Sequence, residues 1–213
     1  MVNPDGKPDL GFLRSLAKLI KNSKNSFGIL VGGGNLARTY AQAARELGAG
    51  EYEADNVAIV ETRQNAALVI AALREQGIDV HRSVLTDFEE AKHLDNKAVV
   101  MGGTIPGITT DTDAVLLAEA TGAGRLINIS NVDAVYESDP RKNPGAKKFA
   151  KMSYDQLIAL AAESDKRKAG TNFVFDMLAC KLIARSGIET HFVSKKDMQN
   201  AIEGKKHSGT VVS

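Results

Sequence analysis

The sequence predicts an α/β fold with an open, mostly parallel sheet and helices on both faces. Short apolar runs are each followed by a helical segment, and this order repeats along the chain. The apolar runs do not alternate with polar residues, which is typical of strands buried on both faces. The 213 residues include 43% hydrophobic and 25% charged residues, an ordinary globular composition that excludes wholesale disorder.

In the first half of the chain we expect helices over 10–21, 35–47, 56–76 and 88–94, and strands over 27–31, 78–85 and 98–101. Asp9 stands directly before the first helix as an N-cap, because its carboxylate can accept a hydrogen bond from first-turn amides. Gly48 and Gly77 follow the second and third helices, where a glycine commonly ends a helix.

In the second half we expect helices over 113–121 and 176–186, and strands over 125–130 and 189–193. Gly122 and Gly187 close the two helices. The segment 131–152 breaks the rhythm, since it holds Asp139-Pro140 and Asn143-Pro144-Gly145. These are turn sequences, so we expect a loop or a hairpin over the sheet edge.

Composition excludes several classes of protein. With 27 Lys and Arg against 26 Asp and Glu, the net charge is +1, which argues against a dedicated nucleic-acid partner. No apolar run is long enough to span a membrane, and the N-terminus does not resemble a signal peptide, so we expect a cytoplasmic protein with no membrane partner. We interpret Cys180 as a small core residue, and the four histidines share no metal-ligand spacing, so no metal-binding residue is predicted.

The first polar turn is Gly32-Gly33-Gly34, between a predicted strand and a predicted helix. Glycines let backbone N–H groups come close to an anion, and a helix N-terminus adds partial positive charge. Arg38, one turn into the helix, is placed to add a phosphate contact. The alternative is a tight turn with no ligand, and the spacing matches neither the P-loop nor the Rossmann pattern.

The second polar turn runs from Gly102 to Asp111 and holds three glycines, three threonines and a carboxylate. Hydroxyls and backbone amides suit a phosphate or a ribose. In the simpler interpretation, Asp111 and Asp113 only cap the next helix. A cap needs far fewer residues than this turn has, so we favour a ligand site.

The third polar turn runs from Ser130 to Pro140 and again follows a predicted strand. Tyr136 suits stacking on a base, and Asp139 suits holding a ribose or a base edge. A turn-rich loop with a partly buried tyrosine is an equally supported alternative. The sequence does not decide whether Asp133 serves a site or only the turn.

Two further features leave alternatives open. Lys166-Arg167-Lys168 is interpreted as a solvated run, with Lys168 kept as a candidate cation for phosphates. Asp176 either caps the last long helix or faces the site, and the pattern favours neither.

Taken together, these turns resemble those of the amino acid kinase family and, within it, the archaeal-type UMP kinases (uridylate kinases). The matching motifs are GGGNLAR at 32–38, MGGTIPGITTD at 101–111, SNVDAVYESDP at 130–140 and HSGTVV at 207–212. The resemblance runs from about Asp9 to the end and implies the family's three-layer α/β sandwich. It also implies phosphoryl transfer from ATP to UMP with Mg²⁺, in a cytoplasmic homohexamer that serves pyrimidine nucleotide biosynthesis.

The resemblance further implies a role for each matched residue. The residues expected to bind UMP are Gly33, Asp55, Thr104, Ile105, Pro106, Gly107, Ile108, Thr109 and Thr110. The residues expected to bind ATP are Gly34, Arg38, Ser130, Tyr136 and Asp139. Asp111 matches the family's aspartate that organises the groups around the transferring phosphoryl, and Lys168 is a second catalytic candidate.

The sequence departs from the family in two places. Family members begin with a strand that ends in Gly-Gly-Ser, which holds phosphates, and no such segment precedes the first predicted helix. We therefore expect a single amino acid kinase domain over 1–213 that lacks its first strand. The loss of one hydrogen-bond donor to a transition-state oxyanion typically lowers a rate by about 10²–10³. We therefore expect weak or no activity from these residues alone and a competent enzyme when the chain is extended at its N-terminus. Ser130 stands where the family often has threonine and keeps the hydroxyl.

Two other functions remain open. One is a different small-molecule kinase of the same fold, acting on a carboxylate, carbamate or isoprenoid phosphate. The loop 104–110 together with Asp55 favours a nucleoside monophosphate over these. The other is a nucleotide-binding protein without turnover, which UMP binding without phosphorylation by an N-terminally extended protein would favour.

Overall fold

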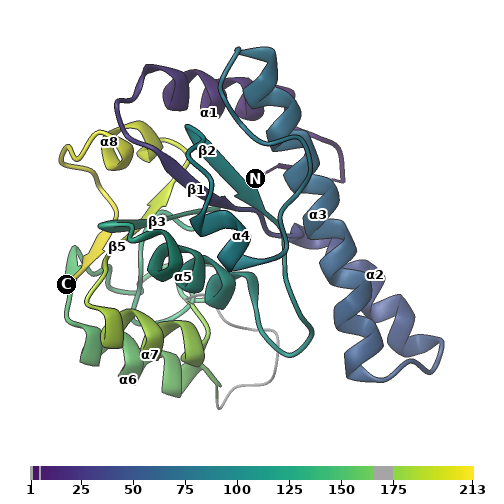
Figure 1. Ribbon diagram of the computed structural model, residues 1–213. Helices are drawn as coiled ribbons and strands as arrows, with labels where there is room; N and C mark the ends of the chain where they lie inside the picture. The colour runs from purple at the N-terminus through teal and green to yellow at the C-terminus, as the bar shows by residue number, and fades with distance from the viewer. Residues whose placement is uncertain (1, 5, 166–174) are drawn as a thin grey trace. The chain divides into compact units, whose positions relative to one another are not determined.

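The chain is described by a computed structural model that covers residues 2–4, 6–165 and 175–213. It divides into two compact units, Met1–Thr121 and Gly122–Ser213 (Figure 1). Within the described parts, no helix is long and apolar enough to cross a membrane. The expectation of a single domain over 1–213 stays a prediction.

The first unit is built on two parallel strands. Its elements are α1 (Leu10–Asn22), β1 (Phe27–Leu30), α2 (Gly34–Glu46), α3 (Glu51–Glu75), α4 (Phe88–Lys92), β2 (Ala98–Met101) and α5 (Thr110–Thr121). β1 pairs with β2 in register, with Phe27 opposite Ala98 and Leu30 opposite Met101. Helix α3 packs against α1 and α2, and α5 packs against β1. Because the strands are parallel, the loops that follow them leave the sheet at the same edge.

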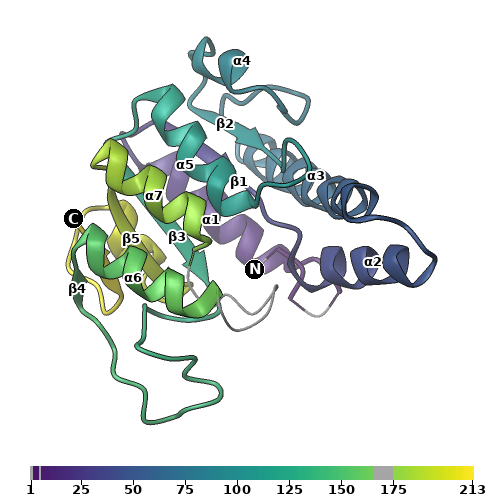
Figure 2. The same cartoon turned by 90° about the horizontal axis from the view of Figure 1, so that it is seen from below.

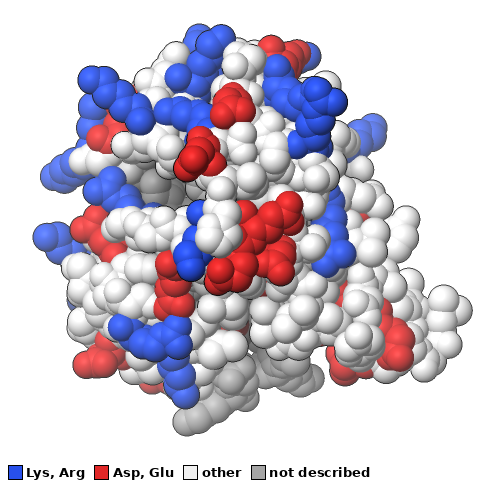
Figure 3. Space-filling model, viewed as in Figure 1, with Lys and Arg blue, Asp and Glu red and all other residues white. Residues whose placement is uncertain are grey.

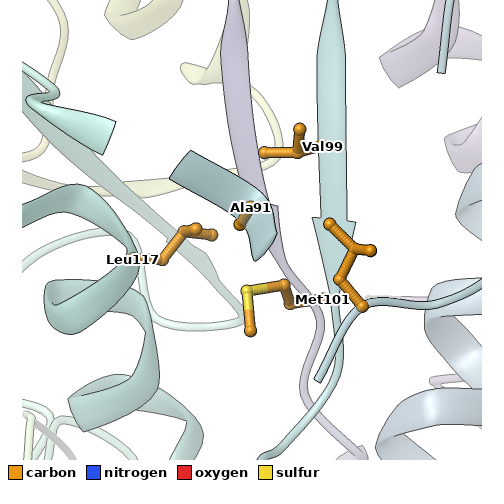
Figure 4. Packing of buried hydrophobic residues seen from close by; sticks show 5 residues of the cluster. Ala91, Val99, Met101 and Leu117 are labelled. Atoms are coloured by element: carbon orange, nitrogen blue, oxygen red, sulfur yellow. The ribbon is translucent and has the colours of Figure 1, made fainter. Parts of the chain in front are cut away.

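The core of this unit lies between β2 and two helices. Every residue of β2 is buried, as its unbroken apolar run predicts. Val99 and Met101 of β2 belong to one cluster with Ala91 of α4, Leu117 of α5 and Leu85 (Figure 4). This packing fixes the end of β2, and with it the start of the threonine-rich loop.

The short helix α4 carries its own acidic cap. The Asp87 carboxylate accepts hydrogen bonds from the backbone N–H groups of Glu89 and Glu90, at 2.7 and 3.2 Å. Negative charge near a helix N-terminus is favourable because the first amides point toward it. Figure 3 shows acidic side chains gathered over this helix.

The predicted start of the first helix is confirmed, while α3 begins earlier than predicted. The Asp9 carboxylate accepts a hydrogen bond from the Phe12 N–H at 2.8 Å. Helix α3 begins at Glu51 rather than at residue 56, with Gly50 as its N-cap. Gly48 and Gly77, each with a positive φ, follow α2 and α3 as expected.

The predicted strand over 78–85 was wrong. It is reduced to two isolated bridges, Val80 to Ala98 and Leu85 to Met101. Between them the His81 ring accepts a hydrogen bond from the Val100 N–H, at 2.7 Å from Nε2. The imidazole thus replaces a main-chain partner of β2, so a continuous strand is not needed there.

The second unit holds a mixed four-stranded sheet. Its elements are β3 (Arg125–Ser130), β4 (Lys151–Met152), α6 (Tyr154–Asp165), α7 (Met177–Ser186), β5 (Glu189–Ser194), α8 (Met198–Ile202) and β6 (Thr210–Val212). The strand order is β3-β5-β6-β4, and only β5 and β6 run antiparallel among the described pairs of this sheet. Helices α6 and α7 pack side by side (Figure 2). Most strand pairs of the described chain are therefore parallel, as predicted.

The segment 131–152 forms a hairpin, one of the two predicted alternatives. Tyr136 and Lys148 make an antiparallel bridge, and the Phe149 N–H donates to the Val135 carbonyl at 3.0 Å. The segment then enters β4, which lies at one edge of the sheet. The hairpin therefore carries the third polar turn out from the end of β3.

Candidate functional site

Two of the predicted polar turns lie side by side at the ends of β1 and β2. The Val31 N–H, just beyond β1, donates to the carbonyl of Met101, the last residue of β2, at 3.0 Å. A Cβ atom placed on Gly32 would lie 3.5 Å from the Thr110 Oγ1. The first unit therefore brings the glycine turn and the threonine-rich loop together, at the carboxyl edge where open α/β sheets bind ligands.

The glycine turn has no room for a side chain at its second position. A Cβ on Gly33 would stand 2.3 Å from the Ala37 Cβ, and Gly34 has φ +66°. Among the described residues, no side chain caps the start of α2 at Gly33. Backbone amides at such a helix start suit an anion. Arg38, one turn later, donates from Nε to the Gly34 carbonyl at 3.3 Å and stays exposed.

A buried polar cluster on α3 and at the N-terminus is hydrogen-bonded to the glycine turn. Asn65 of α3 donates to the Gly32 carbonyl at 3.0 Å. Asn3 in turn donates to Asn65 Oδ1 at 3.2 Å and to Glu61 Oε1 at 3.1 Å. Sequence reasoning missed these residues; polar side chains inside the mostly apolar face of a long helix are the pattern that points to them.

Helix α3 also holds the start of the threonine-rich loop. Arg63 donates from Nε to the Gly103 carbonyl at 3.1 Å and from Nη2 to the Thr104 carbonyl at 2.9 Å. The hydroxyl of Thr62 accepts a hydrogen bond from the Gly103 N–H at 2.7 Å. A Cβ on Gly102 would come within 2.9 Å of the Arg63 backbone nitrogen, so the loop needs glycine to pass this close to α3.

At the start of α5 the Thr109 side chain acts as a cap, and Asp113 contacts Thr104. The Thr109 hydroxyl accepts from the N–H groups of Asp111 and Thr112, at 3.1 and 3.3 Å. Asp113 is 1% exposed and accepts instead from Thr104, at 2.6 Å from its Oγ1 and 3.2 Å from its N–H. Burial raises the pKa of Asp113, and the hydrogen bonds from Thr104 and the Arg63 charge oppose that rise.

Asp55 holds the far part of the same loop. Its Oδ2 accepts a hydrogen bond from the Gly107 N–H at 2.9 Å, and Gly107 has φ +90°. Ile105, Gly107 and Thr109 are exposed. The first unit therefore brings together all the residues predicted to bind UMP, as well as Gly34, Arg38 and Asp111.

The other residues predicted to bind ATP lie in the second unit. The Ser130 hydroxyl donates to the Val132 carbonyl at 2.8 Å and accepts from the Val132 N–H at 3.1 Å. The hydroxyl of Tyr136 donates to Asp133 at 2.8 Å, and Lys148 Nζ lies 2.6 Å from the other carboxylate oxygen. Partial burial favours protonation of Asp133, but Lys148 and Tyr136 outweigh it and lower its pKa. Asp133 therefore orients the tyrosine within the turn.

Three candidates remain, Asp139, Asp176 and Lys168, and the structure describes the first two. Asp139 is held by Arg141, whose Nε lies 2.9 Å from Oδ1, and this hydrogen bond lowers the pKa of Asp139. Asp176 caps α7 by accepting from the Ala179 N–H at 3.0 Å. Lys168 lies outside the described residues. Within the described ranges, no group of three or more His, Cys, Asp or Glu side chains is arranged to hold a metal ion.

Residues 2–194 match the amino acid kinase family model, so the chain belongs to the amino acid kinase family. It is similar to the uridylate kinase of Pyrococcus abyssi, with 46% identity over 97% of this chain and 92% of the relative. It is also similar to the uridylate kinase of Thermococcus kodakarensis, with 45% identity over 96% and 92% of the two chains. The crystal structure of uridylate kinase from Archaeoglobus fulgidus superimposes with a TM-score of 0.83, at 40% identity over 95% and 92% of the two chains. The predicted fold class and the family resemblance are confirmed.

Proposed function

We propose that this protein is a UMP kinase, which transfers the γ-phosphoryl group of ATP to UMP and so supplies UDP for pyrimidine nucleotide biosynthesis. The observation that carries the proposal is the identity of 45–46% with two uridylate kinases over more than nine-tenths of each chain. The local geometry supports it, because the glycine turn and the threonine-rich loop stand together at one sheet edge.

For UMP, we assign the loop 104–110 to the phosphate and the base, with the glycine turn and Asp55 as further contacts. The start of α2 at Gly33 has no side-chain cap within the described parts of the chain, so its amides suit a phosphate. Asp55, at the Gly107 end of the loop, is suited to accept hydrogen bonds from ribose hydroxyls or from the base. The remaining loop residues, from Thr104 to Thr110, would enclose the nucleotide.

For ATP, we assign Gly34 and Arg38 to the phosphates, and Ser130, Tyr136 and Asp139 to the nucleoside. Asp111, in the first turn of α5, would organise the groups around the transferring phosphoryl, and Lys168 is kept as a candidate cation. Phosphoryl transfer needs little covalent help from a protein, so positioning and charge stabilisation account for most of the catalysis. Amides, hydroxyls and a guanidinium are the groups that such catalysis uses.

Mg²⁺ belongs to this proposal as an ion carried on the ATP phosphates. Mg²⁺ is commonly bound through substrate phosphates and few protein ligands, and the described residues contain no ready-made cage for a metal. When bound, it neutralises the charge that develops on the phosphate oxygens. The chain's own residues bind and orient the two nucleotides around it.

The test is a phosphotransfer assay with ATP and Mg²⁺ against UMP, CMP, AMP and N-acetylglutamate, paired with calorimetric titration of each acceptor. We expect UDP as the product and selective binding of UMP. A folded protein that neither binds UMP nor makes UDP would overturn the proposal. Phosphorylation of N-acetylglutamate would favour another activity of the same family, and UMP binding without turnover would favour a nucleotide-binding role.

We also propose that the protein is cytoplasmic and associates with itself as a homohexamer. Helices α2 and α3 pack together and leave four large apolar side chains exposed on this pair and its connection. They are Tyr40, Leu47, Tyr52 and Val60. Exposed apolar side chains that gather on one part of a protein are typical of an interface.

A further inference from the structure

Asp113 is a buried carboxylate that the roles proposed above do not use. Asp113 is 1% exposed, and both of its oxygens accept hydrogen bonds from a single residue, Thr104. A buried carboxylate is unfavourable unless it is hydrogen-bonded, so this pairing must persist for the fold to tolerate the charge. Asp113 thereby ties the main chain and the side chain of Thr104 to α5.

The hydrogen bond to Asp113 fixes the direction of the Thr104 hydroxyl. A threonine hydroxyl has one hydrogen and two lone pairs, whereas an ionised carboxylate only accepts. When Asp113 is ionised, the hydroxyl, 2.6 Å from Asp113 Oδ1, donates its single hydrogen to the carboxylate. Toward any other group, the Thr104 oxygen can then only accept a hydrogen bond.

The main chain around Thr104 is equally fixed. Its carbonyl accepts from Arg63, as does the carbonyl of Gly103, and the Gly103 N–H donates to Thr62. The Arg63 guanidinium also favours the charged form of Asp113, against the effect of burial. The position and the polarity of the Thr104 hydroxyl are therefore set before any ligand arrives.

We propose that Asp113 is a positioning residue that makes the Thr104 hydroxyl an acceptor, so that it binds an N–H or O–H donor of the pyrimidine nucleoside and not a phosphate oxygen. The inference rests on the proposed UMP kinase activity. The donors meant are the uracil N3–H and the ribose 2′-hydroxyl, and not the 3′-hydroxyl that UMP, CMP and dUMP share. CMP lacks a hydrogen on N3, and dUMP lacks the 2′-hydroxyl, so the two analogues distinguish the two sources.

The test is Asp113→Asn, which keeps the shape and removes the charge. The single acceptor of the new side chain would take the Thr104 N–H, and its NH₂ would donate to the hydroxyl, which turns the hydroxyl hydrogen outward. We expect the KM for UMP to rise about tenfold, with kcat and the KM for ATP within about twofold of wild type. We also expect the variant to lose the preference for UMP over the analogue that lacks the donor. Asp95→Asn, a charge loss at an exposed residue, is the matched control.

A double variant separates this role from a general effect on folding. In a Thr104→Val background, Asp113→Asn should cause no further rise in the KM for UMP, because the hydroxyl it orients is gone. A KM unchanged by Asp113→Asn, or UMP, CMP and dUMP weakened by the same factor, would overturn the inference. A wild-type protein that does not bind UMP would instead overturn the proposed function on which the inference rests.

Discussion

The imidazole rings of His191 and His207 share a hydrogen bond, with Nδ1 of His191 2.7 Å from Nε2 of His207. The Gly209 N–H donates to His207 Nδ1 at 3.1 Å, so that nitrogen carries a lone pair and the ring hydrogen is on Nε2. His191 then donates from Nε2 to Glu189 at 2.9 Å. This series of hydrogen bonds is complete only when both rings are neutral. An added proton would turn an accepting ring nitrogen into a donor that faces another N–H donor.

The protein should therefore lose stability in mild acid. Burial lowers the pKa of His207, and the charges of His191 and Arg125 act in the same direction. Asp197 and Glu189 act against the shift without reversing it. As the pH falls, an unfolded histidine takes up a proton near pH 6.5, before the folded one does. The free energy of unfolding therefore keeps its full value above about pH 6.5 and falls as the pH drops through the lowered pKa.

Urea unfolding across about pH 5 to 8 measures this loss. His207→Asn should flatten the acid side of the profile, because the group with the shifted pKa is gone. His93→Gln removes a highly exposed histidine and should leave the profile as it is in the wild type. A wild-type stability that stays constant between about pH 7.5 and 5.5 would contradict a neutral histidine pair.

Gly33→Ala should damage the glycine turn. The new Cβ would stand 2.3 Å from the Ala37 Cβ, inside the first turn of α2, so the helix start must move. We expect a loss of about 1–3 kcal/mol in the free energy of unfolding and a larger fractional loss of UMP phosphorylation. Thermal unfolding and kcat/KM for UMP measure the two effects.

Gly124→Ala is the control for this substitution. A Cβ there meets nothing within 4 Å, so both quantities should stay near the wild-type values. Equal losses of stability and of kcat/KM in Gly33→Ala and Gly124→Ala would show that the close approach of Gly33 to Ala37 is not needed for activity.

Helix ends and buried strands follow from local chemistry, which is why the sequence predicts them well. The boundary residues Asp9, Gly48 and Gly187 act at the helix ends where they were expected. Helix α6 was missed although its cap is readable. Ser153 and Gln156 exchange side-chain hydrogen bonds with each other's N–H groups, at 2.9 and 3.2 Å, the Ser-x-x-Gln pattern of a capping box.

Long-range polar pairings could not be predicted in the same way. His81 displaces a strand because its ring reaches the Val100 N–H, which depends on how the chain turns after residue 80. Asp113 was interpreted as a possible cap because caps are local, whereas its partner Thr104 lies across a loop. In the sequence, nothing distinguishes Arg63 from other helix residues. Its role is visible only in the fold, which places the threonine-rich loop beside it.

Charged substitutions at exposed apolar residues of α3 and of the connection between α2 and α3 should weaken self-association. Tyr52 is 66% exposed and Leu47 is 89% exposed, so neither supports the fold of a single chain. If these side chains are buried between copies, Leu47→Glu with Tyr52→Glu places two charges in an apolar interface and should produce smaller species in sedimentation velocity. Gln64→Glu, which adds a charge at an exposed residue of α3, should leave the assembly intact. A wild-type monomer, or an unchanged assembly in the double variant, would exclude this surface as the contact.

Arg63→Lys should weaken UMP binding without unfolding the protein. The guanidinium holds two successive carbonyl groups, at Gly103 and Thr104, with two nitrogens in a fixed geometry. A lysine ammonium on a flexible stem can satisfy one carbonyl well but not both, so the threonine-rich loop should be less ordered before the nucleotide binds. We expect the KM for UMP to rise about fivefold to tenfold, the scale of one lost hydrogen bond, with a smaller change in the KM for ATP.

Arg14→Lys is the matched control, because Arg14 makes an exposed ion pair with Glu75 at 3.2 Å. Such surface pairs contribute little, so steady-state kinetics should show no change. If both arginine variants raise the KM for UMP equally, the effect is a general consequence of replacing arginine with lysine, and the hold of Arg63 on the loop is not what orders it. If Arg63→Lys alone does so, the loop is ordered from α3 before UMP arrives, and binding avoids the entropy of fixing it.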